Sequence, residues 1–266
     1  FKKLKLDLSG ITAVTMPGFG TTGRTRNNAE ILAEALKVDF KTISIDKAVR
    51  QHFSDIGQDE NTYDITYENS QARERTQILM DLSNKLGGIV IGTGDMSEIA
   101  LGWCTYNGDQ MSMYNVNAGV PKTMIQELIR YMSENKFGNE IADVLKDICN
   151  TPISPELLPP DVAGNIEQKT ESEIGPYELH DFFLFHHLKS NFEPQKIAYI
   201  CSIAFHGKYS TAEIKKWLNI FYKRFFTQQF KRNPMPDGPK VCQISLSPRG
   251  ELRLPSEFSP NIWLMD

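Results

Sequence analysis

Two stretches of the chain repeat the order strand, glycine- and threonine-rich loop, helix, and this repetition limits the fold most. Residues 11–16 are β-branched and apolar, the loop at 17–23 holds three glycines, and residues 27–37 have apolar side chains at helical spacing. Residues 89–91 form a second short apolar run, and residues 92–95 lead from it into a short helix. Buried strands joined by crossover helices are typical of parallel sheets. The sequence therefore predicts an α/β fold with an open, mostly parallel, Rossmann-like sheet and helices on both faces.

Both predicted strands end in loops that suit a nucleotide. In open α/β sheets, ligands bind outside the carboxyl ends of the strands. The loops at 17–23 and 92–95 would then lie at the same edge of the sheet. Backbone N–H groups and hydroxyls in such loops can hold phosphate or ribose oxygens. We therefore expect a nucleotide site at this edge.

The other elements of the first half follow from composition and spacing. Residues 40–45 predict a strand, and residues 71–86 predict a helix whose apolar arc includes Leu82 and Leu86. Residues 107–121 are rich in Asn, Gly, Met and Tyr, and they predict a long ordered loop before a further helix.

The chain is expected to form one domain over residues 1–266, built of two parts. An α/β nucleotide-binding core covers residues 1–150. Residues 151–160 contain four prolines, which exclude a helix interior. Residues 177–226 carry three amphipathic helices. The part at 151–266 is therefore expected to be a proline-rich loop followed by a helical C-terminal region.

Charge and cysteine usage exclude several classes of protein. The 29 basic and 33 acidic residues give a net charge of −4, which argues against a dedicated nucleic-acid binder. No apolar run approaches the roughly 18–20 residues that a membrane span needs. The four cysteines lie at least 41 residues apart, so we expect neither a zinc cage nor a disulfide framework. Residues 1–5 lack the apolar segment of a signal peptide, and we expect a cytoplasmic protein.

A dinucleotide-binding pattern offers one alternative function. Gly18, Gly20 and Gly23 match G-x-G-x-x-G literally, and Asp46 follows 23 residues later. Against this, residues 24–28 are charged or polar where the dinucleotide fold packs its helix closely on the sheet. An NAD-dependent oxidoreductase that uses this loop remains an alternative, and a plain strand-to-helix turn explains the pattern equally well.

Longer motifs carry a more specific signal. They lie at residues 67–73, 92–98, 101–106, 114–123, 155–160, 175–183, 228–232 and 245–250. Together these motifs closely resemble the synthetase domain of glutamine-dependent NAD synthetases, which are N-type ATP pyrophosphatases. The resemblance covers nearly the whole chain and implies an adenine nucleotide alpha-hydrolase-like fold.

The resemblance implies a ligase reaction in two steps. The nicotinate carboxylate of deamido-NAD attacks the α-phosphorus of ATP, which gives an NAD-adenylate and pyrophosphate. Ammonia then attacks the activated acyl carbon and releases AMP and NAD. Mg²⁺ accompanies ATP, and a separate glutaminase domain supplies the ammonia in the family, with free ammonium as the other source. Relatives bind deamido-NAD near a subunit interface, so a homodimer or larger homo-oligomer is expected.

The resemblance also implies which residues bind each ligand, without a certain catalytic residue. The ATP site would include Thr15, Met16, Thr93, Lys122 and Ser154. The deamido-NAD site would include Asn69, Arg73, Glu98, Trp103, Cys104, Thr105, Tyr106 and Lys231. Glu98 would also bind Mg²⁺.

The residue chemistry agrees with these roles but leaves simpler ones open. Asn69 and Arg73 are four residues apart on one helix face, and they could equally be a helix cap and a surface arginine. The helix dipole alone would favour a carboxylate at Glu98. Aromatic rings at Trp103 and Tyr106 suit stacking on nicotinate and also suit a core. 

The basic excess over residues 223–253 likewise suits pyrophosphate or a solvated face. Cys104 is expected to be a small wall residue, because acyl adenylation needs no thiol nucleophile. His186 and His187 face different sides of a helix and are expected to be structural.

The sequence departs from the family at its start. The Ser-Gly-Gly-x-Asp-Ser loop that wraps the ATP pyrophosphate is expected a few tens of residues before Ile11, and Ser9-Gly10 does not match it. The glutaminase domain is likewise not part of these 266 residues. A catalytically inactive nucleotide-binding or assembly fragment is therefore a further alternative.

Overall fold

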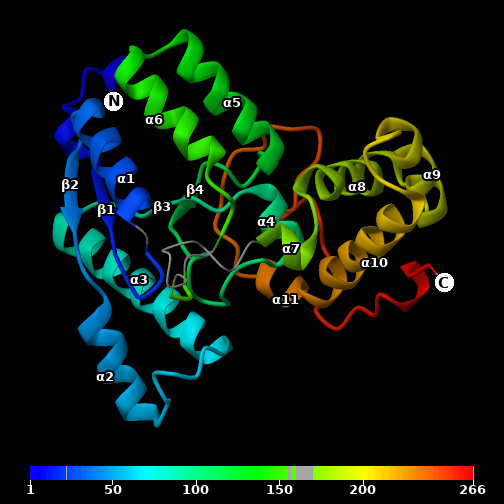
Figure 1. Cartoon of the computed structure of the whole chain (residues 1–266), viewed down its shortest axis with the longest axis horizontal. Helices are drawn as coiled ribbons and strands as arrows, with labels where there is room; N and C mark the ends of the chain where they lie inside the picture. The colour runs from blue at the N-terminus through cyan, green and yellow to red at the C-terminus, as the bar shows by residue number, and fades with distance from the viewer. Residues whose placement is uncertain (22, 155–156, 160–169, 266) are drawn as a thin grey trace. The chain divides into compact units, whose positions relative to one another are not determined.

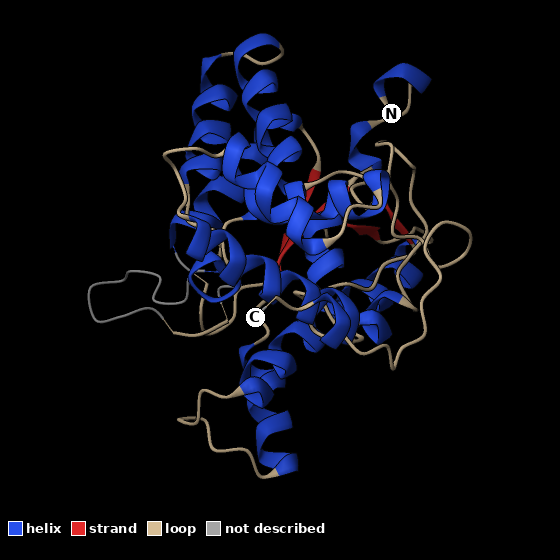
Figure 2. Ribbon diagram, turned by 90° about the vertical axis from the view of Figure 1, so that its right-hand side faces the viewer, coloured by secondary structure: helices blue, strands red, loops and turns tan. Residues whose placement is uncertain are grey.

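The computed structural model describes residues 1–21, 23–154, 157–159 and 170–265. Helices make up most of its regular structure, and the strands are short (Figure 2). The chain divides into two compact units, the first comprising Phe1–Asp81 with Gln126–Lys169 and the second Leu82–Ile125 with Thr170–Asp266. The boundary at residue 150, between the predicted nucleotide-binding core and the C-terminal part, stays a prediction. None of the helices in the described ranges is both long enough and apolar enough to cross a membrane.

The first unit begins with a parallel strand–helix–strand motif. β1 (Thr12–Thr15) pairs with β2 (Asp39–Thr42), with Thr12 opposite Asp39 and Thr15 opposite Thr42. Helix α1 (Gly23–Leu36) connects them and packs on both strands (Figure 1). The predicted α/β fold with parallel strands is thereby confirmed for this segment.

A small aromatic core lies beside the loop that follows β1. Ile45, Val49 and Phe53 are buried at the start and on the inner face of α2 (Asp46–Ile56), and Tyr67 joins them from α3 (Ile65–Leu86). Phe19 packs against this cluster from the loop after β1. The strand predicted at 40–45 therefore ends early, because Ile45 turns into this core to begin α2.

Helix α6 (Asn139–Asn150) packs on α1 in the same unit. Arg24 Nε donates to Asp147 Oδ2 at 2.8 Å, and Asn28 Nδ2 donates to the same oxygen at 2.7 Å. The polar residues at the start of α1 therefore pair with α6.

The second unit contains the other pair of parallel strands. β3 (Ile91–Gly92) pairs with β4 (Tyr114–Asn115), and α4 (Met96–Leu101) and α5 (Lys122–Asn135) begin after these strands. β4 lies inside the segment predicted to be a loop. Its two residues are too few to give the alternating pattern by which a strand is recognised.

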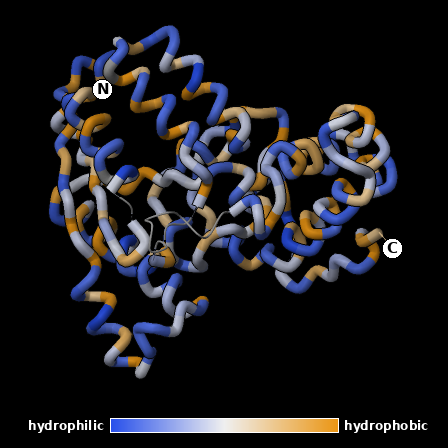
Figure 3. The backbone as a smooth tube through the Cα atoms, viewed as in Figure 1, coloured by the Kyte–Doolittle hydropathy of each residue, from blue (hydrophilic) through white to orange (hydrophobic). Residues whose placement is uncertain are grey.

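The helical part of the second unit confirms the three helices predicted over residues 177–226, which are α8 (Tyr177–Ser190), α9 (Pro194–Ala204) and α10 (Thr211–Thr227). It also comprises α7 (Thr170–Ile174) and α11 (Gln229–Arg232). Ile214, Leu218, Phe221 and Phe225 of α10 are fully buried, because α8 and α9 pack against it. Hydrophobic and hydrophilic positions are mixed along each of these helices (Figure 3).

Three expectations about the first half are wrong in detail. Helix α3 begins at Ile65 rather than at residue 71, so Asn69 lies inside the helix and does not cap it. Leu86 is 52% exposed and does not belong to the apolar arc, because the helix ends there at Gly87. Within the described residues the strands pair as two two-stranded sheets, and Ile89 is exposed although it was expected in a central strand.

Candidate functional site

The implied ligand residues divide between the two units. Thr15, Met16, Asn69, Arg73 and Ser154 lie in the first unit. Thr93, Glu98, Trp103, Cys104, Thr105, Tyr106, Lys122 and Lys231 lie in the second. The structure brings several members of the second set into direct contact.

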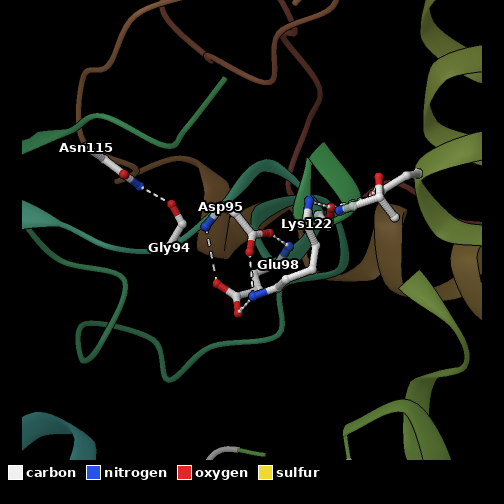
Figure 4. Close-up of polar contacts among 8 residues, drawn as sticks. Gly94, Asp95, Glu98, Asn115 and Lys122 are labelled. Atoms are coloured by element: carbon white, nitrogen blue, oxygen red, sulfur yellow. Dashed lines mark hydrogen bonds and ion pairs between the residues drawn. The ribbon is translucent and has the colours of Figure 1, made fainter. Parts of the chain in front are cut away.

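The loop after β3 positions a carboxylate pair around Lys122. Asp95 caps α4, since its Oδ1 accepts from Glu98 N at 3.0 Å while its own N–H donates to Glu98 Oε2 at 3.2 Å. This reciprocal capping box holds both acidic side chains at the helix N-terminus. Lys122 Nζ lies 2.5 Å from Asp95 Oδ2 and 2.7 Å from Glu98 Oε1 (Figure 4).

The three charged groups differ in exposure. The Asp95 side chain is 2% exposed, whereas that of Glu98 is 26% exposed. Burial, with repulsion from Glu98, raises the pKa of Asp95 above its ordinary value. Burial lowers the pKa of Lys122, but the two carboxylates outweigh it and the net pKa is raised. A charged ammonium is thus the favoured form of Lys122.

A partly buried carboxylate of α8 helps to fix the backbone of Lys122. Lys122 N donates to Ser97 Oγ at 2.8 Å, and Ser97 Oγ in turn donates to Asp181 of α8. Asp181 Oδ2 also accepts from Thr123 N at 3.1 Å and from Thr123 Oγ1 at 2.7 Å. The first turn of α5 is thereby tied to α4 and α8.

Sequence reasoning missed three residues of this network. Asp95 and Asp181 were given no role, and neither was Tyr177, whose ring centre lies 5.4 Å from Lys122 Nζ. A D-x-x-E capping pattern at Asp95 and Glu98 could have identified the first. The other two follow Gly175-Pro176 far along the chain, and only the packing of α8 brings them to Lys122.

Glu98, Cys104 and Lys231 line one narrow pocket of the second unit. Its walls also include Gly94, Gly102, Asp109, Gln110, Asn115 and Arg232, and its cavity volume is about 30 Å³. Asn115 Nδ2 closes one side by donating to Gly94 O at 2.8 Å (Figure 4). This volume holds little more than a water molecule, so a planar ring enters only if a wall residue moves.

Lys231 lines this pocket and bonds to two backbone carbonyls. Its Nζ donates to Gly102 O at 3.0 Å and to Cys104 O at 2.7 Å, and burial lowers its pKa. Cys104 Sγ donates to Gln110 Oε1 at 2.7 Å, and burial raises its pKa to about 12. The thiol is therefore neutral at pH 7, as a wall residue would be.

The residues next to Cys104 have partners inside the unit. The Arg224 guanidinium lies 4.9 Å above the Trp103 ring, and the Tyr106 ring lies 5.4 Å from that of Phe230. Thr105 N donates to Asp109 Oδ1 at 2.6 Å. Thr93 lies between β3 and Asp95, at the strand end where it was expected.

In the first unit, the glycine loop is part of the packing. Gly18 N donates to Thr21 Oγ1 at 3.1 Å, and Phe19 N donates to Gln71 Oε1 at 3.2 Å. A Cβ at Gly18 would lie 2.8 Å from Gln71 Oε1. These contacts support the plain turn over the dinucleotide fingerprint.

The remaining residues of the first unit lie on separate elements. Thr15 ends β1 opposite Thr42, and Met16 packs on the aromatic core. Arg75, which was given no role, donates from Nε to Met16 O at 3.0 Å. Asn69 is half-buried and Arg73 exposed on α3, and Ser154 is half-buried beyond α6. Three of the six residues of the implied motif at 155–160 lie outside the described residues.

Comparisons with known proteins identify the family. The NAD synthase family model matches residues 3–229. The glutamine-dependent NAD(+) synthetase of Mycobacterium tuberculosis H37Rv is 47% identical over 281 residues, covering 96% of this chain and 41% of the relative. The Mycobacterium leprae enzyme of the same name is 45% identical, with the same coverage. The chain thus spans about two fifths of the length of these relatives.

Solved structures show the same fold. A glutamine-dependent NAD(+) synthetase from Cytophaga hutchinsonii has a TM-score of 0.74 at 22% identity and covers 94% of this chain and 39% of that one. An NMN synthetase from Francisella tularensis has a TM-score of 0.56 at 24% identity, covering 75% and 76%. Because the family model matches most of this chain, the chain belongs to the NAD synthase family.

Proposed function

We propose that this chain is the synthetase part of a protein that amidates deamido-NAD to NAD at the expense of ATP. The products would be NAD, AMP and pyrophosphate. The observation that carries the proposal is the Lys122 ammonium, fixed beside two carboxylates where the loop after β3 meets α4. Membership of the NAD synthase family supports the same reaction.

The proposed chemistry needs positive charge more than it needs a nucleophile on the protein. A nicotinate carboxylate oxygen attacks the α-phosphorus of ATP, and the bond to pyrophosphate breaks. Ammonia then forms a bond to the acyl carbon, loses a proton, and AMP leaves. Both substrates are polyanions, so fixed cations hold them and stabilise the charge that develops on phosphate.

The chain's cations have assignable roles in this scheme. Lys122 would contact ATP phosphates, and Lys231 would contact deamido-NAD near Cys104, Thr105 and Tyr106. The ring of Trp103 would complete the deamido-NAD wall. These assignments are supported by the pocket that Glu98, Cys104 and Lys231 share.

We also assign a ligand to each of the remaining implied residues. We assign Thr15, Met16 and Ser154, together with Thr93 of the second unit, to ATP. We assign Asn69 and Arg73 to deamido-NAD. Both side chains are on the second and third turns of α3, four residues apart and therefore on one face.

Glu98 fits one part of a magnesium site. Mg²⁺ is usually bound by one or two carboxylates together with substrate phosphates and water. Glu98 offers one partly exposed carboxylate, and Lys122 and the Asp95 N–H already contact its oxygens. Bound there with ATP, the ion would neutralise phosphate charge. No cluster of three or more acidic, histidine or cysteine side chains that could hold a metal occurs in the described ranges.

Ammonia would come from glutamine, through a glutaminase domain in the complete protein, or from free ammonium. The name of the relatives, glutamine-dependent NAD(+) synthetase, supports the first source. We also propose a cytoplasmic homodimer or larger homo-oligomer.

An end-point assay on the complete polypeptide encoded by the gene tests the proposal. Protein is mixed with deamido-NAD, ATP, Mg²⁺ and ammonium chloride, and NAD, AMP and pyrophosphate are quantified. Equal amounts of the three products are expected. Absence of all three from a folded protein that carries a Ser-Gly-Gly-x-Asp-Ser segment would refute the ligase and favour an inactive nucleotide-binding module.

A further inference from the structure

The side chain of Lys122 needs a positioning partner if it is to meet ATP. An ammonium on a flexible four-carbon stem loses rotamer freedom when it is held in one place. Asp95 and Glu98 both contact Nζ, at 2.5 Å and 2.7 Å. Only one of the two carboxylates is shielded from solvent and ligand, because Asp95 is buried and Glu98 is not.

The backbone fixes Asp95 independently of Lys122. Its Oδ1 accepts from Glu98 N, which completes the N-cap of α4, and its Oδ2 is thereby turned toward Lys122. One carboxylate thus has two separable roles, a cap through one oxygen and an ion pair through the other (Figure 4). Glu98, in contrast, is the more exposed carboxylate, and in the proposed function it is shared with Mg²⁺.

We propose that Asp95 is a positioning residue for ATP, whose buried carboxylate holds the Lys122 ammonium where it meets phosphate. The proposal rests on the function proposed above. When Glu98 binds Mg²⁺ or substrate in place of Lys122, Asp95 remains the counter-ion that keeps the Lys122 ammonium in place. Asp181 supports the same arrangement from the other side, because it holds Ser97 and Thr123 and so fixes the first turn of α5.

Asp95→Asn separates the two roles. Asparagine caps helices about as well as aspartate and has nearly the same shape, so the N-cap persists while the ion pair is lost. Measured on the complete protein, the KM for ATP should rise at least about thirtyfold, the low end of what loss of a buried charge partner costs. The KM for deamido-NAD should change by less than about threefold. The melting temperature should shift by only a few degrees.

Ser210→Ala is the matched control for capping. Ser210 and Glu213 form a capping box of the same kind at α10. Its loss should lower the melting temperature and leave both KM values unchanged. If Asp95→Asn leaves the KM for ATP unchanged, as Ser210→Ala does, Asp95 is only a cap and the proposal is overturned.

A double-mutant cycle makes the test independent of the folding of one variant. Lys122→Met removes the ammonium, and combining it with Asp95→Asn removes both charges, so no buried charge is left unpaired. The proposal requires that Asp95→Asn has no further effect on the KM for ATP in the Lys122→Met background. Additive effects would contradict positioning through Lys122. If wild-type protein binds ATP in calorimetry but makes no NAD, the proposed function fails, and the same cycle on the ATP dissociation constant still decides the role of Asp95.

Discussion

Lys122 is held by three residues at the N-terminus of α4, and this decides what its substitution should do. Its Nζ contacts two carboxylates of the α4 N-terminus and its backbone is bonded to Ser97. Lys122→Met should lower kcat/KM for ATP by about 10²- to 10³-fold, the usual cost of removing one fixed group that stabilises charge in a transition state.

Lys208→Met is the control for this variant. Lys208 pairs with Glu178, and its side chain is largely exposed on the same unit. Loss of an exposed pair changes stability by less than about 1 kcal/mol, so activity should stay near wild type. Equal activity losses in both variants, measured by NAD formation, would contradict a specific role for Lys122.

Cys104 lies in the candidate site, but its thiol is not in the reactive thiolate form. It lines the same pocket as Glu98 and Lys231, yet burial raises the pKa of its thiol to about 12. The thiolate is the nucleophilic form, so Cys104 should be nearly inert to iodoacetamide at pH 8. Cys104→Ser should retain kcat within about threefold in the NAD assay. Loss of more than about 100-fold would assign the thiol a chemical role.

At the scale of elements, α4 depends on the glycine that ends it. Gly102 has a φ of 57°, and a Cβ there would lie 2.4 Å from Gln228 Cβ. Gly57 ends α2 with a φ of 72°, and a Cβ there would meet open space. Both alanine variants carry the cost of a left-handed backbone, but only Gly102→Ala also causes a clash.

Gly102→Ala should therefore unfold more easily than Gly57→Ala. The difference in unfolding free energy should be about 1–3 kcal/mol, the usual cost of overpacking. Urea unfolding of the two variants measures it. Because Gly102 O also accepts from Lys231 Nζ, only Gly102→Ala should raise the KM for deamido-NAD. Equal stabilities would show that Gln228 moves aside without cost.

The packing of α8 on α10 makes stability depend on pH. His187 lies among the rings of Tyr222, Phe225 and Trp263, and burial lowers its pKa to about 4. The folded state thus binds fewer protons than the unfolded chain between about pH 6.5 and pH 4. The contribution of His187 to the free energy of unfolding is therefore complete above about pH 6.5, and it decreases as the pH falls from about 6.5 to about 4.

His187→Phe tests this pH dependence. Its Nδ1 has no hydrogen-bond partner among the residues that the structure describes, so a phenyl ring loses no visible bond there. The variant should match wild type in melting temperature at pH 7.5 and exceed it at pH 5. Parallel melting curves across pH 5–7.5 would show that His187 does not titrate in this way. His180, whose pKa burial also lowers to about 4, adds the same trend in both proteins.

At the scale of the whole molecule, the implied ligand residues are shared between two compact units. Thr15, Met16, Asn69, Arg73 and Ser154 are in one and the remainder in the other. The family resemblance further implies that deamido-NAD binds near a subunit interface. Sedimentation velocity on the complete protein should therefore give a homodimer or a larger assembly. A stable monomer with full NAD-forming activity would contradict this expectation.

The sequence by itself determined several of the helices, the strand β1 and the family. Local patterns sufficed because helix periodicity, capping residues and glycine ends are short-range signals, as α10 shows with Ile214, Leu218 and Phe221 all buried. The order of the motifs from residue 67 to residue 250 is sufficient to indicate the NAD synthase family.

Only the tertiary structure decided which residues surround Lys122. Asp181 and Tyr177 are more than 50 residues from it along the chain, and no spacing rule joins them to it. It also decided that Ile45 and Phe19 share a core and that Asp95 is the buried member of the carboxylate pair. Burial depends on how distant elements pack, and burial determines which charges pair and where their pKa values lie. A pattern read along one chain carries no such information.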